Sequence, residues 1–316
     1  MRETTMTVSS SVALIGLARL RRNSDWQNLD NWNWRERISF ISHGVQTTIQ
    51  VTEPAALVPI KLRLPPGWRE IKERGMEPGY SLVVGNRVAP SGLDRLHLLL
   101  RGDALISAAY NLEPVLGALE SELDRRVAER AAPERVFIRA GVVGWRGRAI
   151  VVVGPPQSGR STLVAALLRA GGTYYSDHYA VLDSDGLVYP YARPLWLSTG
   201  AFVNPVRYRP EELGARTGTQ ALAVGTVVFA SYRARTQPRF MPLGRSAVIG
   251  ELMASAVCAK SHAQHTQASI AKALAGAWIL KGERGEAEGI VDLLLGRRPR
   301  SRLKPWANRL RHPPER

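Results

Sequence analysis

Residues 151–168, VVVGPPQSGRSTLVAALL, have the composition of a phosphate-binding loop that follows a strand and opens a helix. Gly154, Gly159, Arg160 and Ser161 occupy the four defining places of the pattern Gly-x4-Gly-Lys-Ser/Thr, with arginine where lysine is expected. Glycines at these places let backbone N–H groups turn toward phosphate oxygens at a helix N-terminus. The sequence therefore predicts a phosphate-binding site, and the alternative is a plain structural turn.

Arginine at position 160 keeps the positive charge and can hold a phosphate through two hydrogen bonds, but it is bulkier than lysine. Phosphoryl transfer depends on accurate positioning, so binding can persist where transfer fails. Asp177, in YYSDHY, follows the next strand and is a candidate metal ligand or proton acceptor. Because Asp commonly begins turns, a purely structural role for Asp177 is the alternative.

The elements that must position these residues are legible in residues 133–296. An apolar strand precedes the loop, a glycine-closed helix follows it, and a turn at 145–147 joins that strand to an earlier one. Further along the chain we expect a strand and a hairpin over 173–191, a strand over 222–232, one Ala-rich helix over 245–276 and a last helix in 285–296.

The residues before 133 show a different pattern of apolar and polar residues. Residues 36–132 predict a small α+β domain, with strand-like stretches before and after a short helix that begins near Glu53. Val115, Leu119 and Leu123 repeat at four and predict a long helix that stops near Pro133. Residues 1–35 are expected to be partly mobile, and 297–316 to form a flexible basic tail.

Composition narrows the choice of partners. The net charge is +16, with many arginines in the tail, so nucleic acid is a conceivable partner. That hypothesis rests on charge alone, without a recognisable reading module, and we do not expect nucleic acid as a partner. The single Cys258 and the lack of an apolar run of about 18 residues favour a cytoplasmic protein that does not engage a membrane.

The stretch 135–195 resembles the HPr kinase/phosphorylase family and its HPr-kinase-related serine kinases, on the loop already quoted and on YYSDHYAVLDSDG. GERGEAE, further along, resembles them more loosely. The resemblance implies an α/β fold: a P-loop, phosphoenolpyruvate-carboxykinase-like core with a smaller N-terminal α+β domain. It also implies ATP and Mg²⁺ as cofactors and, as partner, a small protein or peptide that carries a target serine.

Site roles come from the same resemblance. It assigns metal binding to Ser161 and Asp177, and it assigns nucleotide binding to Gly154, Gln157, Ser158, Gly159, Arg160, Ser161 and Thr162. The catalytic positions are Asp177, His178 and Arg139, but Arg139 replaces the family's histidine and His178 replaces its second carboxylate. Two functions stay open: a weakly active serine kinase, or a degenerate relative that binds nucleotide or a partner. Homo-oligomerisation also stays open.

Three further residues carry alternatives. Arg193 follows the hairpin and either supports phosphate binding or is an ordinary surface arginine. His262 and His265 are three apart, and we favour a solvated helix face over a pair of metal ligands because no third ligand is in view.

Overall fold

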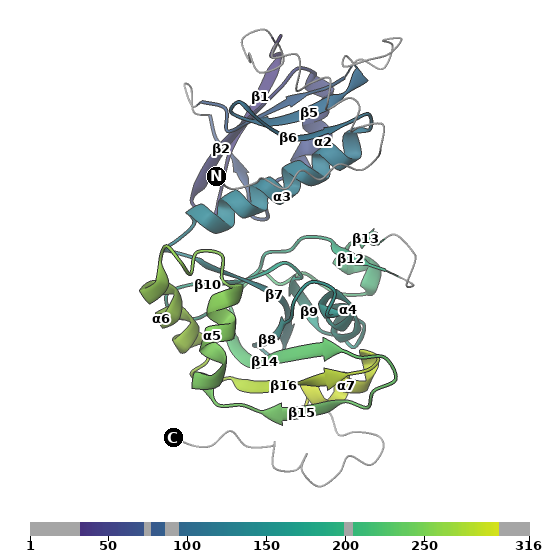
Figure 1. Ribbon diagram of the computed structural model, residues 1–316, viewed down its shortest axis with the longest axis vertical. Helices are drawn as coiled ribbons and strands as arrows, with labels where there is room; N and C mark the ends of the chain where they lie inside the picture. Colours follow the sequence, from purple (N-terminus) through teal and green to yellow (C-terminus); the bar gives the residue numbers. More distant parts are fainter. Residues whose placement is uncertain (1–31, 73–76, 86–94, 199–204, 297–316) are drawn as a thin grey trace. The chain divides into compact units, whose positions relative to one another are not determined.

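The computed structural model describes residues 32–72, 77–85, 95–198 and 205–296 (Figure 1). The chain divides into two compact units, Met1–Arg130 and Ala131–Arg316, and each is described by itself. The segments 1–31 and 297–316, predicted to be mobile and flexible, lie outside the described residues. Helices and several sheets make the fold mixed α/β, and no described helix is long and apolar enough to cross a membrane.

The N-terminal unit is a six-stranded sheet with helices packed on one face. Its strands run in the order β3-β1-β2-β4-β5-β6, and β2 and β4 are the parallel pair. The elements are β1 (Glu36–Ser42), β2 (Val45–Val51), η3 (Pro54–Ala56), α2 (Leu57–Lys61), β3 (Arg69–Glu70), β4 (Tyr80–Val83), β5 (His97–Arg101), β6 (Ala104–Ala109) and α3 (Leu112–Arg130).

Helix α3 buries the predicted apolar stripe. Val115, Leu119 and Leu123 are each at most 1% exposed and pack in one cluster with Phe40 and Ile49 of the sheet. This is the face that a repeat of four residues creates on a helix. Strand β6 was not expected, because its small residues, ALISAA, give a weak strand pattern; pairing along β5 determines it.

The second unit is built on an eight-stranded sheet of order β11-β10-β7-β8-β14-β16-β15, with β9 paired to β7. Strands β8, β14 and β16 are parallel neighbours. The elements are β7 (Val136–Trp145), β8 (Arg148–Val153), α4 (Arg160–Arg169), β9 (Thr173–Ser176), β10 (Tyr179–Leu182), β11 (Val188–Tyr189), β12 (Leu195–Leu197), β13 (Val206–Tyr208), η5 (Pro210–Leu213), β14 (Ala223–Tyr232), β15 (Arg239–Pro242), α5 (Arg245–Ser255), α6 (Ala263–Ala273), β16 (Trp278–Arg284) and α7 (Glu288–Leu294).

Helices cover both faces of this sheet (Figure 1). Alternate residues of β8 point to opposite sides: Ile150 and Val152 join the cluster of α4 and α7, while Val151 and Val153 join that of α5 and α6. A strand buried on both faces reads as a continuous apolar run, which is why AIVVV precedes the loop. The loop therefore leaves a rigid central strand.

The prediction of a single helix over 245–276 is wrong. Two helices, α5 and α6, are separated at Ala256, which is extended and forms a bridge with Ile138 of β7. The N–H of Val257 donates to the carbonyl of Phe137 at 2.9 Å, so pairing with β7 overrides the helix propensity of an Ala-rich segment. Shortly after α6, Trp278 begins β16.

Gly186, in the turn between β10 and β11, has a φ of +78°, and a Cβ there would lie 2.3 Å from the backbone nitrogen of Ala273 in α6. Gly214 has a φ of +73° with nothing within 4 Å of a Cβ. We expect Gly214→Ala to lower the free energy of unfolding by roughly 1 kcal/mol from backbone strain alone. Gly186→Ala should lower it by roughly 3 kcal/mol or more, because α6 must also move.

Urea unfolding of the two variants measures both free energies. Equal losses would contradict the close packing of this turn against α6.

Candidate functional site

The loop between β8 and α4 is a tight turn that needs glycine at both ends. Gly159 has a φ of +76° and Gln157 a φ of +66°, both in the left-handed region. A Cβ on Gly154 would lie 2.4 Å from the Ser158 hydroxyl oxygen, and one on Gly159 would lie 2.4 Å from Nη2 of Arg284. Helix α4 then begins at Arg160, and no side chain caps its N-terminus.

Arg284 holds this loop from the neighbouring part of the sheet. Its side chain is 1% exposed, its Nη2 donates to the carbonyl of Gly159 at 2.6 Å, and its Nη1 donates to the carbonyl of Gly285 at 2.8 Å. The guanidinium also lies over the ring of Tyr232, 5.6 Å from its centroid. Burial lowers the pKa of Arg284. Sequence reasoning missed this residue, although GERGEAE, which contains it, was part of the looser resemblance.

Arg160 bridges the loop and the segment after β9. Its Nη1 donates to the carbonyl of Gly154 at 3.4 Å, and its Nε lies 4.0 Å from Oδ1 of Asp177. Gly141 of β7 lies beside this pair: a Cβ there would make ordinary van der Waals contacts with Cγ of Arg160, at 3.5 Å, and with Oδ1 of Asp177, at 3.6 Å, but would lie only 2.5 Å from Cγ2 of Val164. Glycine at 141 therefore permits the close packing of α4 against β7.

Asp177 is held at the turn between β9 and β10. The Ser176 hydroxyl accepts the N–H of His178 at 3.1 Å and that of Tyr179 at 3.0 Å, which fixes the backbone around Asp177. The carboxyl is 3% exposed, and its Oδ1 accepts no hydrogen bond within the described residues. Burial raises the pKa of Asp177, against a hydrogen bond from Ser161 and the charges of Arg160 and His178, which lower it.

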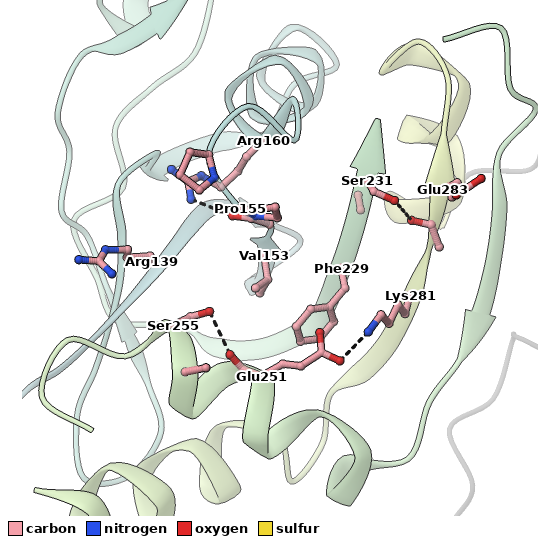
Figure 2. A pocket seen from close by; sticks show the side chains of 15 residues that line it. Arg139, Val153, Pro155, Arg160, Phe229, Ser231, Glu251, Ser255, Lys281 and Glu283 are labelled. Atoms are coloured by element: carbon pink, nitrogen blue, oxygen red, sulfur yellow. Dashed lines mark hydrogen bonds and ion pairs between the residues drawn. The ribbon is translucent and has the colours of Figure 1, made fainter. Parts of the chain in front are cut away.

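A cavity of about 700 Å³ opens beside the loop, at the carboxyl ends of β8, β14 and β16. Its cations are Arg139, Arg160 and Lys281, and its acids are Glu251 and Glu283. Figure 2 shows Arg160 next to Pro155, and Glu251 reaching Lys281, whose Nζ lies 2.6 Å from Oε1. Ligands bind where the carboxyl ends of parallel strands meet, which makes this cavity the candidate site.

The charges that face the cavity are not evenly paired. Lys281 pairs with Glu251, and Glu283 pairs with Arg233 at 3.5 Å. In the described part of the chain no acidic side chain forms an ion pair with Arg139, and Arg160 has only the buried Asp177. Two guanidinium groups are thus available to an anion. Phe229, Val153 and the loop prolines supply apolar walls.

The structure brings some predicted site residues together and separates others. Gly154, Arg160 and Arg139 line the cavity, whereas Ser161 and Asp177 do not; Asp177 lies 4.0 Å from Nε of Arg160, and a hydrogen bond from Ser161 lowers its pKa. Five further predicted residues are not in the cavity lining, although Ser158 is buried and His178 is close enough to act on Asp177: Gln157, Ser158, Gly159, Thr162 and His178. The roles given to these residues stay predictions.

Arg193 is not a surface arginine, because its side chain is buried and only 3% exposed. The hydroxyl of Tyr174 donates to its backbone carbonyl. His262 and His265 lie at the start of α6, and no group of three or more potential metal-ligating side chains occurs among the residues that the structure describes.

Magnesium does not fit the residues present. Mg²⁺ needs near-octahedral oxygen ligands, and carboxylates are its usual protein ligands. Here the described donors are one carboxylate, Asp177, and the hydroxyl of Ser161, and the position of a second carboxylate is occupied by His178. The guanidinium of Arg160 already stands 4.0 Å from the carboxylate that would bind the ion.

No protein-family model and no curated protein matches the chain. Among solved structures, the HPr(Ser) kinase/phosphatase from Coxiella burnetii aligns with 51% of this chain and 93% of its own length, at 13% identity and a TM-score of 0.28.

Asp177→Asn should stabilise the protein near neutral pH, because it removes a buried ionised carboxyl whose Oδ1 has no hydrogen-bond donor. The raised pKa means that the folded state gains a proton as the pH falls. Protonation of Asp177 therefore stabilises the folded state. This contribution is fully present below the pKa that Asp177 has in the unfolded chain, and it is lost as the pH rises through the pKa that Asp177 has in the folded protein. The advantage of asparagine should therefore shrink toward acid pH.

Thermal unfolding from pH 7 to pH 4 measures this, with a rise in Tm of a few degrees expected at pH 7. Asp183→Asn is the matched control, because Asp183 is also buried but accepts the N–H groups of Asp185 and Leu187, each at 2.9 Å. It should lower Tm at pH 7. A lower Tm for Asp177→Asn across the range would contradict this account.

Proposed function

We propose that this chain binds a phosphate-bearing nucleotide such as ATP in the cavity beside the Gly154–Arg160 loop, and does not turn it over. The observation that carries the proposal is the pair of guanidinium groups, Arg139 and Arg160, that face one cavity beside a glycine-bounded loop and the N-terminus of α4. Arginine forks match phosphate oxygens, and helix N-termini favour anions.

The size and walls of the cavity support a nucleotide. A volume of about 700 Å³ lies in the range of small-molecule sites. Phe229 and Val153 offer apolar surface for a base, while Arg160 lies beside the loop, where phosphates would bind.

Phosphoryl transfer would need a general base, and the described residues of the cavity offer no unpaired one. A general base must accept a proton, whereas Arg139, at the position where the resemblance expects a histidine, has a side chain with donors and no acceptor. The cavity carboxylates of Glu251 and Glu283 are each paired with a cation. Asp177 lies behind Arg160 rather than at the cavity surface.

A second candidate function is slow, ATP-dependent phosphorylation of a serine on a small protein or peptide. The contact between Ser161 and Asp177 favours it, because these two residue types serve as metal ligand and as ligand or base in phosphoryl transfer. The two candidates differ in turnover, not in binding.

Calorimetric titration with ATP tests the binding proposal. Gly159→Ala should weaken binding at least tenfold, because its Cβ would displace the Arg284 guanidinium that holds the loop. Gly147→Ala is the matched control: its φ is +75°, nothing lies within 4 Å of its Cβ, and it sits at the other end of β8. The control should bind like the wild type. Absence of ATP binding by the wild type, or equal effects of both variants, would contradict the proposal.

ATP hydrolysis measured at steady state separates the two candidates. The binding proposal predicts no turnover by the wild type or by Arg160→Lys, since neither has a free base in the cavity. The kinase candidate predicts turnover that Arg160→Lys increases and Asp177→Asn abolishes. Turnover with that pattern would replace the first candidate by the second.

A further inference from the structure

We propose that the site binds the phosphate groups of its ligand without a divalent cation, because Arg160 stands between Asp177 and the cavity, where a metal ion would otherwise neutralise charge. This inference rests on the proposed nucleotide binding and goes further by assigning the counter-charge to the chain itself.

The guanidinium of Arg160 lies nearer to the cavity than the carboxylate of Asp177 does. Arg160 lines the cavity, whereas Asp177 is 3% exposed and does not belong to the lining. The two groups lie 4.0 Å apart, and Arg160 is tied to the loop by its hydrogen bond to the carbonyl of Gly154. An anion entering the cavity therefore meets the guanidinium before the carboxylate. Asp177 acts as a positioning residue for Arg160.

The positive and negative side chains at the cavity do not balance. The Asp177 carboxylate neutralises one positive charge, the Lys281–Glu251 pair is neutral, and Arg139 adds a cation that no described carboxylate pairs with. Two arginines then present several N–H donors to phosphate oxygens in fixed planar forks. These donors replace the neutralisation that a divalent cation gives in other nucleotide sites.

The guanidinium of Arg160 opposes the binding of a metal ion to Asp177. An ion bound to Asp177 would lie within a few ångströms of a permanently charged guanidinium, and like charges at that separation repel strongly in a buried site. Binding would also require Arg160 to leave both the carboxylate and the carbonyl of Gly154. The guanidinium of Arg160 thus excludes a divalent cation from solution.

Calorimetry of the full chain with ATP, once with excess EDTA and once with Mg²⁺, tests the inference directly. We expect free ATP to bind at least as tightly as ATP with Mg²⁺. Binding that weakens tenfold or more in EDTA would overturn this inference and leave the proposed function standing. Absence of binding in both conditions would overturn both.

Two arginine variants on the same helix locate the effect. Arg160→Gln keeps polar donors but removes the charge, and should weaken free-ATP binding at least tenfold. Arg169→Ala, in the last turn of α4, is the control and should bind like the wild type. Thermal unfolding of each variant establishes that it is folded. Binding of free ATP by folded Arg160→Gln with wild-type affinity would overturn the inference.

Discussion

The hydrogen bond from Arg284 to the carbonyl of Gly159 determines the shape of the site, because it joins the end of β16 to the loop before α4, which is far away in the sequence. Strands β8 and β16 both flank β14 in parallel, so their carboxyl ends meet at one edge of the sheet. The loop leaves the end of β8, and Arg284 occupies the end of β16. The buried Arg284 donates to the carbonyl of Gly159 and to that of Gly285, and so connects the loop to the end of β16.

On this support the chain places a second arginine with a different task. Arg160 faces a cavity and is oriented from behind by Asp177, whose burial raises its pKa and costs stability when the carboxyl is ionised. Such a cost is typical of functional sites, where charge is arranged for a ligand rather than for the fold. We propose that two arginines and a carboxylate set back from the cavity serve to bind an anion.

Local patterns in the sequence predicted the framework of the site well. The apolar run before the loop, the glycine-bounded loop and the glycine-closed helix after it correspond to β8, the turn and α4, because each depends on neighbouring residues. The hairpin at 184–186 followed from its turn residues in the same way.

Features that depend on distant contacts escaped prediction. The break between α5 and α6 comes from pairing of Ala256 with β7, and nothing in an Ala-rich segment marks it. Strand β16 was missed, and Arg284 with it, because only the parallel pairing with β14 brings that residue to the loop. The sequence also could not show that Arg160 shields Asp177 from the cavity, since that order depends on side-chain packing beside Gly141.

A crystal structure of the protein grown with ATP and without divalent cations would test the central claim most directly. The account predicts phosphate density in the cavity beside the loop, within hydrogen-bond distance of the guanidinium groups of Arg160 and Arg139, with Asp177 still paired to Arg160. Phosphates bound elsewhere, or Arg160 turned away from them while Asp177 faces the ligand, would contradict it.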